Sequence, residues 1–361
     1  MNRIVFGRFE SSCIMINLIC AKMLFMAPRL FTLHSLTAVF LVLAIDLIIS
    51  ALIVLLFVKL MPAEGADIIS LAEKYLGRPA GILISFCAII LMLTKILTQT
   101  RISSSLITNQ AYTAASPFFL NIVIYGAAIL IAYFGIETIS RLHALFVPIS
   151  FTVAAIVISM SIPNVNTSFL FPILGYGMES IKNDIIVSMN CFTDWFVILL
   201  LLPYMKKKNL FSSCARNVFI LSSIITVFVT VLFCGVSSGA AKNDIFSPAL
   251  LLVQFAKVAG HIFRMDVFLL FIWNFLTVLY TCTLLFFCTM CIKKIFKSLD
   301  EKMIAVPLGI SLFSVSIFTE DHPFIEFLYY YSHIICEVCG FAIPFLMLML
   351  IYAKRRRAVK S

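Results

Sequence analysis

Long apolar runs constrain the fold of this chain more than any other feature. The run from Leu36 to Val58 contains a single charged residue, Asp46. It is long enough to cross a bilayer as a helix, which takes about 20 apolar residues. Composition agrees, since the 361 residues are 62% hydrophobic and 12% charged, whereas a soluble domain is about half apolar and a quarter charged. The runs lack the in-out alternation of outer-membrane barrel strands, so they predict membrane-spanning helices.

Ten helices fit the chain as one transmembrane domain over residues 1–361. We place them at about 10–27, 36–58, 80–105, 117–135, 142–162, 184–204, 217–239, 265–292, 303–319 and 325–353. Putting both termini in the cytoplasm brings nineteen of the 27 Lys and Arg residues to cytoplasmic loops and ends, as the positive-inside rule requires. The same rule explains the net charge of +10. We therefore expect contacts of the basic tail with anionic lipid headgroups and no nucleic-acid partner.

An even number of spans divides this domain into two halves of five. Because five is odd, the halves, at about 10–162 and 184–353, have opposite orientations in the membrane. This is the inverted-repeat plan of many transporters, in which the first helix of each half is broken near the middle of the membrane. Polar residues in the first and sixth spans, among them Asn17 and Asn190, fit such breaks.

Two connections carry specific expectations. Gly135 is expected to end one helix, and Glu137 and Arg141, four residues apart, to pair on the first turn of the next. Over residues 240–264 we expect an amphipathic helix lying at the outer surface. Ser247 is its predicted N-cap and Pro248 its first helical residue.

Charged residues inside the predicted spans indicate where helices meet. Lys22, Asp46, Lys95 and Asp194 each lie within an apolar run, where a lone charge costs at least about 2.5–3.5 kcal/mol. We expect Lys22 of the first span to contact Asp194 of the sixth. Two interpretations of these charges stay open. Either Lys22 and Asp194 flank a site for a zwitterionic amino acid, or Lys22–Asp194 and Lys95–Asp46 are buried ion pairs that fix helix packing. A further hypothesis is that the Lys95 ammonium replaces Na⁺ or H⁺ in holding the fold.

Candidate ligand-binding residues follow from the predicted helix breaks. An unwound turn exposes backbone N–H and C=O groups, and the N-terminus of a half-helix favours a carboxylate. A threonine could instead donate a hydrogen bond to the backbone of its own helix. A buried asparagine could form a hydrogen bond to a neighbouring helix. The candidates are Ala21, Lys22, Met23, Thr98, Asn190, Thr193, Asp194 and Asn274.

No enzyme is expected from this sequence. Its five histidines are scattered over predicted loops and span ends, and it has neither an HExxH motif nor a phosphate-binding loop of the P-loop type. Most of the eleven cysteines lie in apolar runs, where we expect small buried side chains. We predict no catalytic residue, metal site or cofactor.

Four segments resemble one family in order and spacing. GIETISRLHALFVPI (135–149) resembles the joint between spans four and five of the spore germination permeases, the B subunits of nutrient germinant receptors. The other three segments resemble the beginnings of their spans three, six and eight. These segments are EKYLGRPAGILI (73–84), FPILGYGMESI (171–181) and FRMDVFLLFIWNF (263–275).

The resemblance implies a fold and a function. That family belongs to the amino acid–polyamine–organocation superfamily and is similar to LeuT in fold. It implies an all-α membrane protein of ten helices with discontinuous helices 1 and 6, and a small-molecule site between helices 1, 3, 6 and 8. It also implies a spore inner membrane location and two partners of the same receptor, a larger membrane subunit and a lipoprotein. The expected function is to bind a small nutrient and signal to those partners. An amino acid permease and a subunit with a vestigial pocket are the alternatives. The chain departs from the family at Lys22, where a small residue is usual, and at Cys191–Asp194, which lacks glycine.

Overall fold

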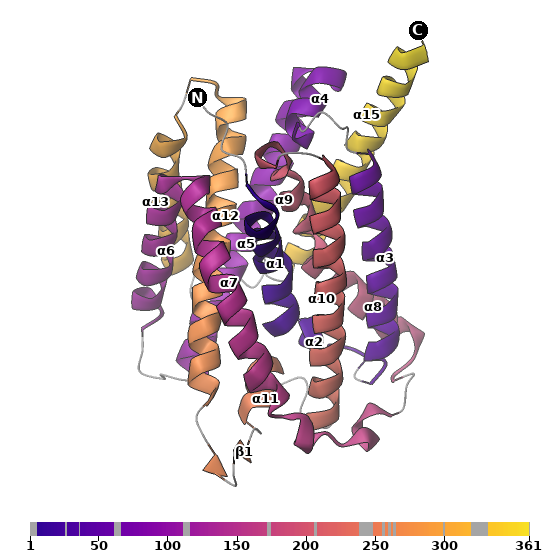
Figure 1. Cartoon of the computed structure of the whole chain (residues 1–361), viewed down its shortest axis with the longest axis vertical. Coiled ribbons are helices and arrows are strands. Elements are labelled where there is room, and N and C mark those ends of the chain that lie inside the picture. Colours follow the sequence, from indigo (N-terminus) through magenta and orange to yellow (C-terminus); the bar gives the residue numbers. More distant parts are fainter. Residues whose placement is uncertain are drawn as a thin grey trace.

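The computed structural model shows an almost entirely helical chain (Figure 1). It describes residues 6–25, 27–35, 37–60, 66–110, 116–171, 175–205, 208–237, 248–254, 257–258, 261–262, 265–298, 300–318 and 331–360. The long helices are α1 (Arg8–Phe25), α3 (Val39–Leu60), α5 (Arg78–Gln110), α6 (Pro117–Phe134), α7 (Ile136–Ser159), α10 (Lys208–Val236), α12 (Met265–Ile295), α13 (Glu301–Phe318) and α15 (Ile343–Lys360). The shorter elements are α2 (Ala27–Leu30), α4 (Ile68–Leu76), η1 (Ile162–Asn164), η2 (Thr167–Leu170), α8 (Met178–Ser188), η3 (Met189–Phe192), α9 (Trp195–Leu199), η4 (Leu202–Tyr204), α11 (Pro248–Gln254), β1 (Lys257–Val258), β2 (His261–Ile262) and η6 (Val338–Ala342).

Seven of the described helices are long and apolar enough to cross a membrane. They are Val39–Leu60, Arg78–Thr108, Pro117–Phe134, Ile136–Asn164, Asn209–Val236, Val267–Ile295 and Tyr331–Arg356. Each overlaps a predicted span. The predicted spans at 10–27, 184–204 and 303–319 overlap α1, α8 with α9, and α13, which are helical but do not belong to this set. The chain is therefore an all-helical integral membrane protein.

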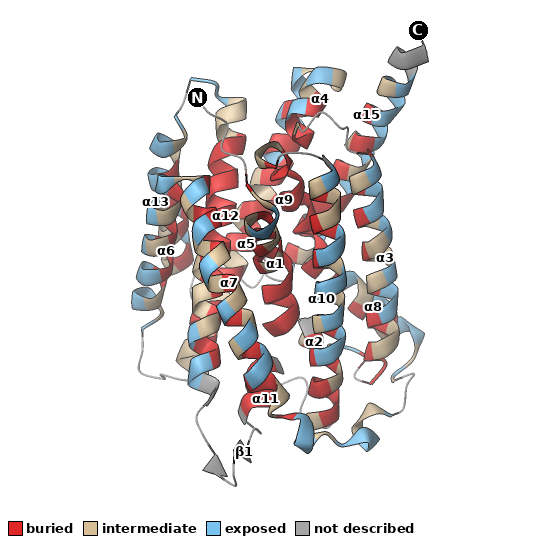
Figure 2. Cartoon of the chain, in the orientation of Figure 1, coloured by how far each residue is buried: buried red, intermediate tan, exposed pale blue. Residues whose placement is uncertain are grey.

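Helix α1 lies at the centre of the molecule. It packs against α7, α10 and α12, and all but five of its eighteen residues are buried. Figure 2 shows buried residues on α1 and α9, while α3, α6 and α10 carry exposed residues on their outer faces. These exposed faces are apolar, with side chains such as Leu55, Val123 and Ile224. An apolar outer face around a core that contains polar groups suits a bilayer.

Basic loops gather at one end of the molecule. The Lys294 ammonium donates to the Asp67 carboxylate, and Lys297 Nζ lies 3.4 Å from Glu73 Oε1. Asp67 also caps α4, since its Oδ1 accepts a 3.0 Å hydrogen bond from the Ser70 amide. In Figure 1 this end is the upper one, where α4 and the end of α15 lie. The loops before α5 and after α12, both counted as cytoplasmic from sequence, therefore meet in the structure.

The turn between α6 and α7 has the predicted geometry. Gly135 has a φ of 92°, a left-handed conformation that favours glycine, and its amide donates to the Ala132 carbonyl. Arg141 and Glu137 form the expected pair, with a distance of 2.6 Å between Nη2 and Oε1. Both side chains are largely exposed, so the pair contributes little stability.

The amphipathic helix predicted over 240–264 is present only in part. Helix α11 begins at Pro248, the predicted first helical residue, but it ends at Gln254, and the short antiparallel strands β1 and β2 follow it. The predicted position at the outer surface is wrong. The apolar residues of α11 face inward rather than toward a membrane surface, since Ala249, Leu250, Leu252 and Val253 are all buried against α7, α10 and α12. The predicted N-cap, Ser247, lies outside the described residues.

Helical geometry changes within the segment that contains Asp194. The α-helical α8 gives way to the 3₁₀ segment η3, and α9 and η4 follow. A π-helical turn, η6, packs directly against this region. A Cβ added to Gly340 of η6 would lie 2.8 Å from the Thr193 Cβ and 3.2 Å from the Thr193 carbonyl oxygen. This close approach requires glycine, and it places the last membrane segment against the turn that carries Asp194.

Replacing Gly340 by alanine should therefore destabilise the protein. We expect the free energy of unfolding to fall by about 1–3 kcal/mol, because the added methyl group overpacks a contact that includes backbone atoms. Thermal unfolding of the purified chain in detergent measures it. Gly126→Ala is the matched control, since nothing lies within 4 Å of a Cβ at that helical position. Equal melting temperatures for the two variants would contradict the proposed close packing.

Candidate functional site

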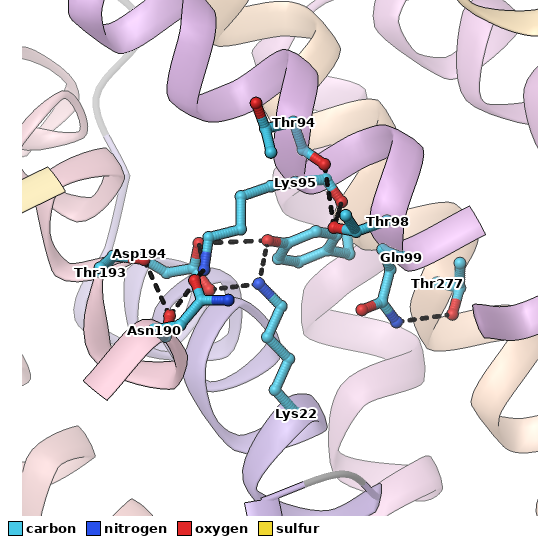
Figure 3. Close-up of polar contacts among 10 residues, drawn as sticks. Lys22, Thr94, Lys95, Thr98, Gln99, Asn190, Thr193, Asp194 and Thr277 are labelled. Atoms are coloured by element: carbon cyan, nitrogen blue, oxygen red, sulfur yellow. Dashed lines mark hydrogen bonds and ion pairs between the residues drawn. The ribbon is translucent and has the colours of Figure 1, made fainter. Parts of the chain in front are cut away.

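A buried ion pair joins α1 to the turn before α9. Lys22 Nζ lies 2.6 Å from Asp194 Oδ2 (Figure 3). Lys22 is 8% exposed and Asp194 fully buried. The predicted contact between the first and sixth membrane segments is therefore present. The ion pair places the last turn of α1 beside the segment 178–204, in which the α-helix α8 gives way to the 3₁₀ segment η3.

Tyr280 of α12 completes this pair. Its hydroxyl accepts a hydrogen bond from Lys22 Nζ and donates one of 3.1 Å to Asp194 Oδ1. Lys22 Nζ also lies 4.4 Å from the centroid of the Tyr280 ring, within the range of a cation–π contact. Sequence analysis missed Tyr280 because it lies in a long apolar run. The available signal was the spacing of three between Thr277, Tyr280 and Thr283, which brings polar groups to one side of a helix.

Lys95 of α5 binds the same turn from the opposite side. Its Nζ donates to the carbonyl oxygen and to Oδ1 of Asn190, each at 2.7 Å. The same nitrogen lies 3.9 Å from Asp194 Oδ1. Figure 3 shows the two lysines approaching the Asn190–Asp194 turn from different helices. Two lysine ammonium groups therefore contact this turn, and the turn itself contributes the carboxylate of Asp194.

The predicted pair between Lys95 and Asp46 is wrong. Asp46 of α3 accepts a hydrogen bond from the Ser188 hydroxyl of α8 instead. Its second carboxyl oxygen, Oδ1, is buried without a hydrogen-bond partner, and so is Glu337 Oε1. Two balanced pairs were expected from the numbers of charges alone, and those numbers could not reveal that Asp46 faces α8 rather than α5.

A cavity of about 90 Å³ adjoins the lysines. This is room for several water-sized molecules. Its walls come from α1, α2, α5, α8 with η3, and the helical residues 331–337. They are formed by Lys22, Leu30, Lys95, Thr98, Gln99, Ile102, Val187, Asn190, Cys191, Ser332 and His333. The resemblance implied a contribution from helix 8, whereas the wall in the structure includes the last membrane segment and no residue of α12.

Three of the eight ligand candidates line this cavity, namely Lys22, Thr98 and Asn190. Thr98 also donates to the Thr94 carbonyl of its own helix, at 2.9 Å. The lining residues Gln99, Ser332 and His333 were not among the candidates. Gln99 lies one residue after Thr98 on α5 and donates to Thr277 Oγ1 at 3.3 Å.

The other five candidates lie outside the cavity wall. Ala21 and Met23 are buried in the hydrophobic core. The Thr193 hydroxyl donates to the Asn190 carbonyl at 2.8 Å, and Asn274 Oδ1 accepts from Ser103 Oγ at 2.7 Å. Asp194, the fifth, is occupied by the contacts described above. Asn274 therefore bonds the neighbouring helix α5.

A second buried polar cluster joins α1, α7 and α12. Asn17 Nδ2 lies 3.1 Å from His143 Nε2, and His143 Nδ1 lies 2.7 Å from the Ile139 carbonyl oxygen. Since a carbonyl only accepts, Nδ1 carries the proton and Nε2 accepts from Asn17. His143 is fully buried, although sequence analysis placed it at a span end. The difference arises because α7 begins at Ile136, six residues before the predicted start.

Metal-ligating side chains do not cluster in the part of the chain that the structure describes, where no three of the His, Cys, Asp and Glu residues come together as a metal site. All eleven cysteines are buried and free, as the apolar runs predicted. The polar groups of the candidate site are therefore ammonium, amide and hydroxyl groups around one carboxylate, which suit a small polar ligand.

Comparison with solved structures defines the class of protein. The fold matches MhsT in complex with L-phenylalanine with a TM-score of 0.69 and 13% identity, over 97% of this chain and 89% of that one. It also matches a Na+-coupled sialic acid symporter with a TM-score of 0.64 and 11% identity, over 94% and 79%. The chain is a membrane protein with the fold of LeuT-like transporters.

Sequence comparison then gives the family. The family model described as "Spore germination protein" matches residues 8–324, so the chain belongs to the spore germination protein family, as the four segments indicated. Spore germination protein A2 of Bacillus subtilis (strain 168) is 27% identical over 232 residues, or 63% of this chain. The match spans 62% of the length of that relative.

Removing the Tyr280 hydroxyl should weaken the site. We expect Tyr280→Phe to cost about 1–3 kcal/mol, because Lys22 and Asp194 each lose a buried hydrogen-bond partner. The free energy of unfolding in mixed micelles measures the loss. Tyr176→Phe is the control, since Tyr176 is 75% exposed and its change should stay within about 0.5 kcal/mol. A neutral effect of Tyr280→Phe would contradict the bridging role.

Proposed function

We propose that this protein is a germinant-sensing membrane subunit. It binds a small nutrient, with an amino acid as the candidate, and signals to a larger membrane subunit and a lipoprotein subunit of the same receptor. The observation that carries the proposal is the cavity beside Lys22, Lys95 and Asn190 in a chain of the spore germination protein family. Buried ionisable groups in membrane segments mark functional sites by default.

The architecture that we propose for this function has ten membrane crossings in two inverted halves, about 10–162 and 184–353. Its first and sixth segments are discontinuous. The change from the α-helix α8 to the 3₁₀ segment η3 supports the break in the sixth segment. Both termini lie in the cytoplasm and the membrane is the spore inner membrane. The meeting of basic loops at one end supports that orientation.

A ligand in this cavity would act through its contacts with Lys95 and Asn190. The cavity lies between the end of α1 with α2, the η3 turn, and residues 331–337. A ligand shifts a conformational equilibrium only if it binds one conformer better than another. Contacts with Lys95 and Asn190 would favour one conformer over another if the conformers differ in the position of the η3 turn relative to α5. In our proposal, that change is the signal passed to the partner subunits.

The alternative is a permease that moves amino acids by alternating access. The fold favours a permease, since MhsT and the sialic acid symporter have the same fold. Fold alone does not fix function. Uptake of labelled amino acid into liposomes that contain only this chain separates the two. Accumulation far above one molecule per protein would establish the permease, and binding without accumulation favours the receptor subunit.

Neutralising the Lys22–Asp194 pair should weaken the nutrient response. We expect spores with Lys22→Met and Asp194→Asn together to need at least about tenfold more nutrient, since a 1.4 kcal/mol loss of binding is a factor of ten. Loss of spore refractility over a nutrient titration measures it. The control is Glu137→Gln with Arg141→Gln, which neutralises an exposed pair of the same kind. A full response of the Lys22/Asp194 double variant, at normal protein abundance, would refute a ligand role for the pair.

A further inference from the structure

The charges at the candidate site do not balance. Two ammonium groups, of Lys22 and Lys95, share the single carboxylate of Asp194. The Lys22 contact is 2.6 Å and the Lys95 contact 3.9 Å. Both lysines are at least nine-tenths buried. With every group in its ordinary ionised form, the cluster carries one excess positive charge.

Both carboxylate oxygens of Asp194 already accept a hydrogen bond from the protein. Its Oδ2 accepts from Lys22 and its Oδ1 from Tyr280. The residue is fully buried and does not line the cavity. The ammonium group of a bound ligand would therefore meet no carboxylate among the wall residues that the structure describes.

The remaining buried carboxyl groups of this region do not correct the imbalance. Asp46 faces Ser188 of α8, and Glu337 lines a separate groove with Ile53 and Phe345. Neither carboxylate forms an ion pair with Lys22 or Lys95, although all four side chains are described. Among the described residues that line the cavity, none is acidic.

Lys95 is the cation best placed to bind a ligand. Lys22 has an ionised partner at 2.6 Å and a tyrosine hydroxyl, whereas the two short contacts of Lys95 are to neutral oxygens of Asn190. Asn190 lines the cavity and accepts through Oδ1, so its Nδ2 group provides an N–H donor at the same residue. An uncompensated buried charge is costly, so an anion entering the cavity would be favoured.

We propose that the cavity binds its ligand through a carboxylate, held by Lys95 and the Asn190 amide, and that it rejects ligands whose only charge is an amine. The inference rests on the proposed function only in taking that ligand to be the nutrient. It narrows the nutrient to small carboxylic acids and to amino acids recognised by their carboxylate. The small cavity volume favours a short side chain.

Four matched compounds test this selectivity on the purified wild-type chain in detergent. They are L-alanine, propionate, L-alaninamide and ethylamine, each added at the same ionic strength. We expect L-alanine and propionate to raise the thermal unfolding midpoint by about 3 °C or more at high excess. We expect no shift with L-alaninamide or ethylamine, which lack a carboxylate. Lys95→Met should abolish the carboxylate shifts, and Lys297→Met, at a side chain 66% exposed, should keep them.

The outcomes separate this inference from the proposed function. Equal shifts from propionate and L-alaninamide, or no shift from any of the four compounds, would overturn the carboxylate inference. So would unchanged carboxylate shifts in Lys95→Met. If such a result accompanies a lost nutrient response in the Lys22/Asp194 double variant, the proposed function stands without the inference. Carboxylate shifts that need Lys95, together with normal germination of spores that carry Lys95→Met, would support the inference and overturn the function.

Discussion

Two lysines converge on the one buried carboxylate of Asp194, and the packing of three chain segments depends on this contact. α1 supplies Lys22, α5 supplies Lys95, and the turn after α8 supplies Asp194 with Asn190. In a membrane, a charged side chain without a partner is costly. The three segments must therefore stay together for the charges to remain buried, and any movement of the turn changes all of these contacts at once.

The fold was largely predictable because a bilayer restricts the possible answers. Only helices and closed barrels satisfy their backbone groups in lipid, and runs such as Leu36–Val58 have the length of a span. Charged residues within the runs then identified the Lys22–Asp194 contact. The segment 240–264 was less predictable, because its apolar residues fit burial in the protein as well as burial in a membrane surface. Helix α11 is buried among α7, α10 and α12.

The candidate site was predictable in its charges but not in its details. Lys95 and Asp46 carry opposite charges and therefore balance. However, the direction of each side chain depends on the rotation of its helix about its own axis, and the apolar sequence around these residues does not specify that rotation. Tyr280 and His143 were missed for different reasons. Tyr280 lies within an apolar run, and His143 fell outside a span whose start was placed too late. Lys22 brings a charge to the first segment and adds to the excess positive charge at the site.

The most direct test of this account is the coupling between Lys22 and Asp194 in a double-mutant cycle. The free energy of unfolding is measured for the wild type, Lys22→Met, Asp194→Asn and the double variant. Because each single change leaves a buried charge without its partner, we predict a coupling free energy of about 2 kcal/mol or more. Single effects that add to within about 0.5 kcal/mol would contradict the contact on which the site is built.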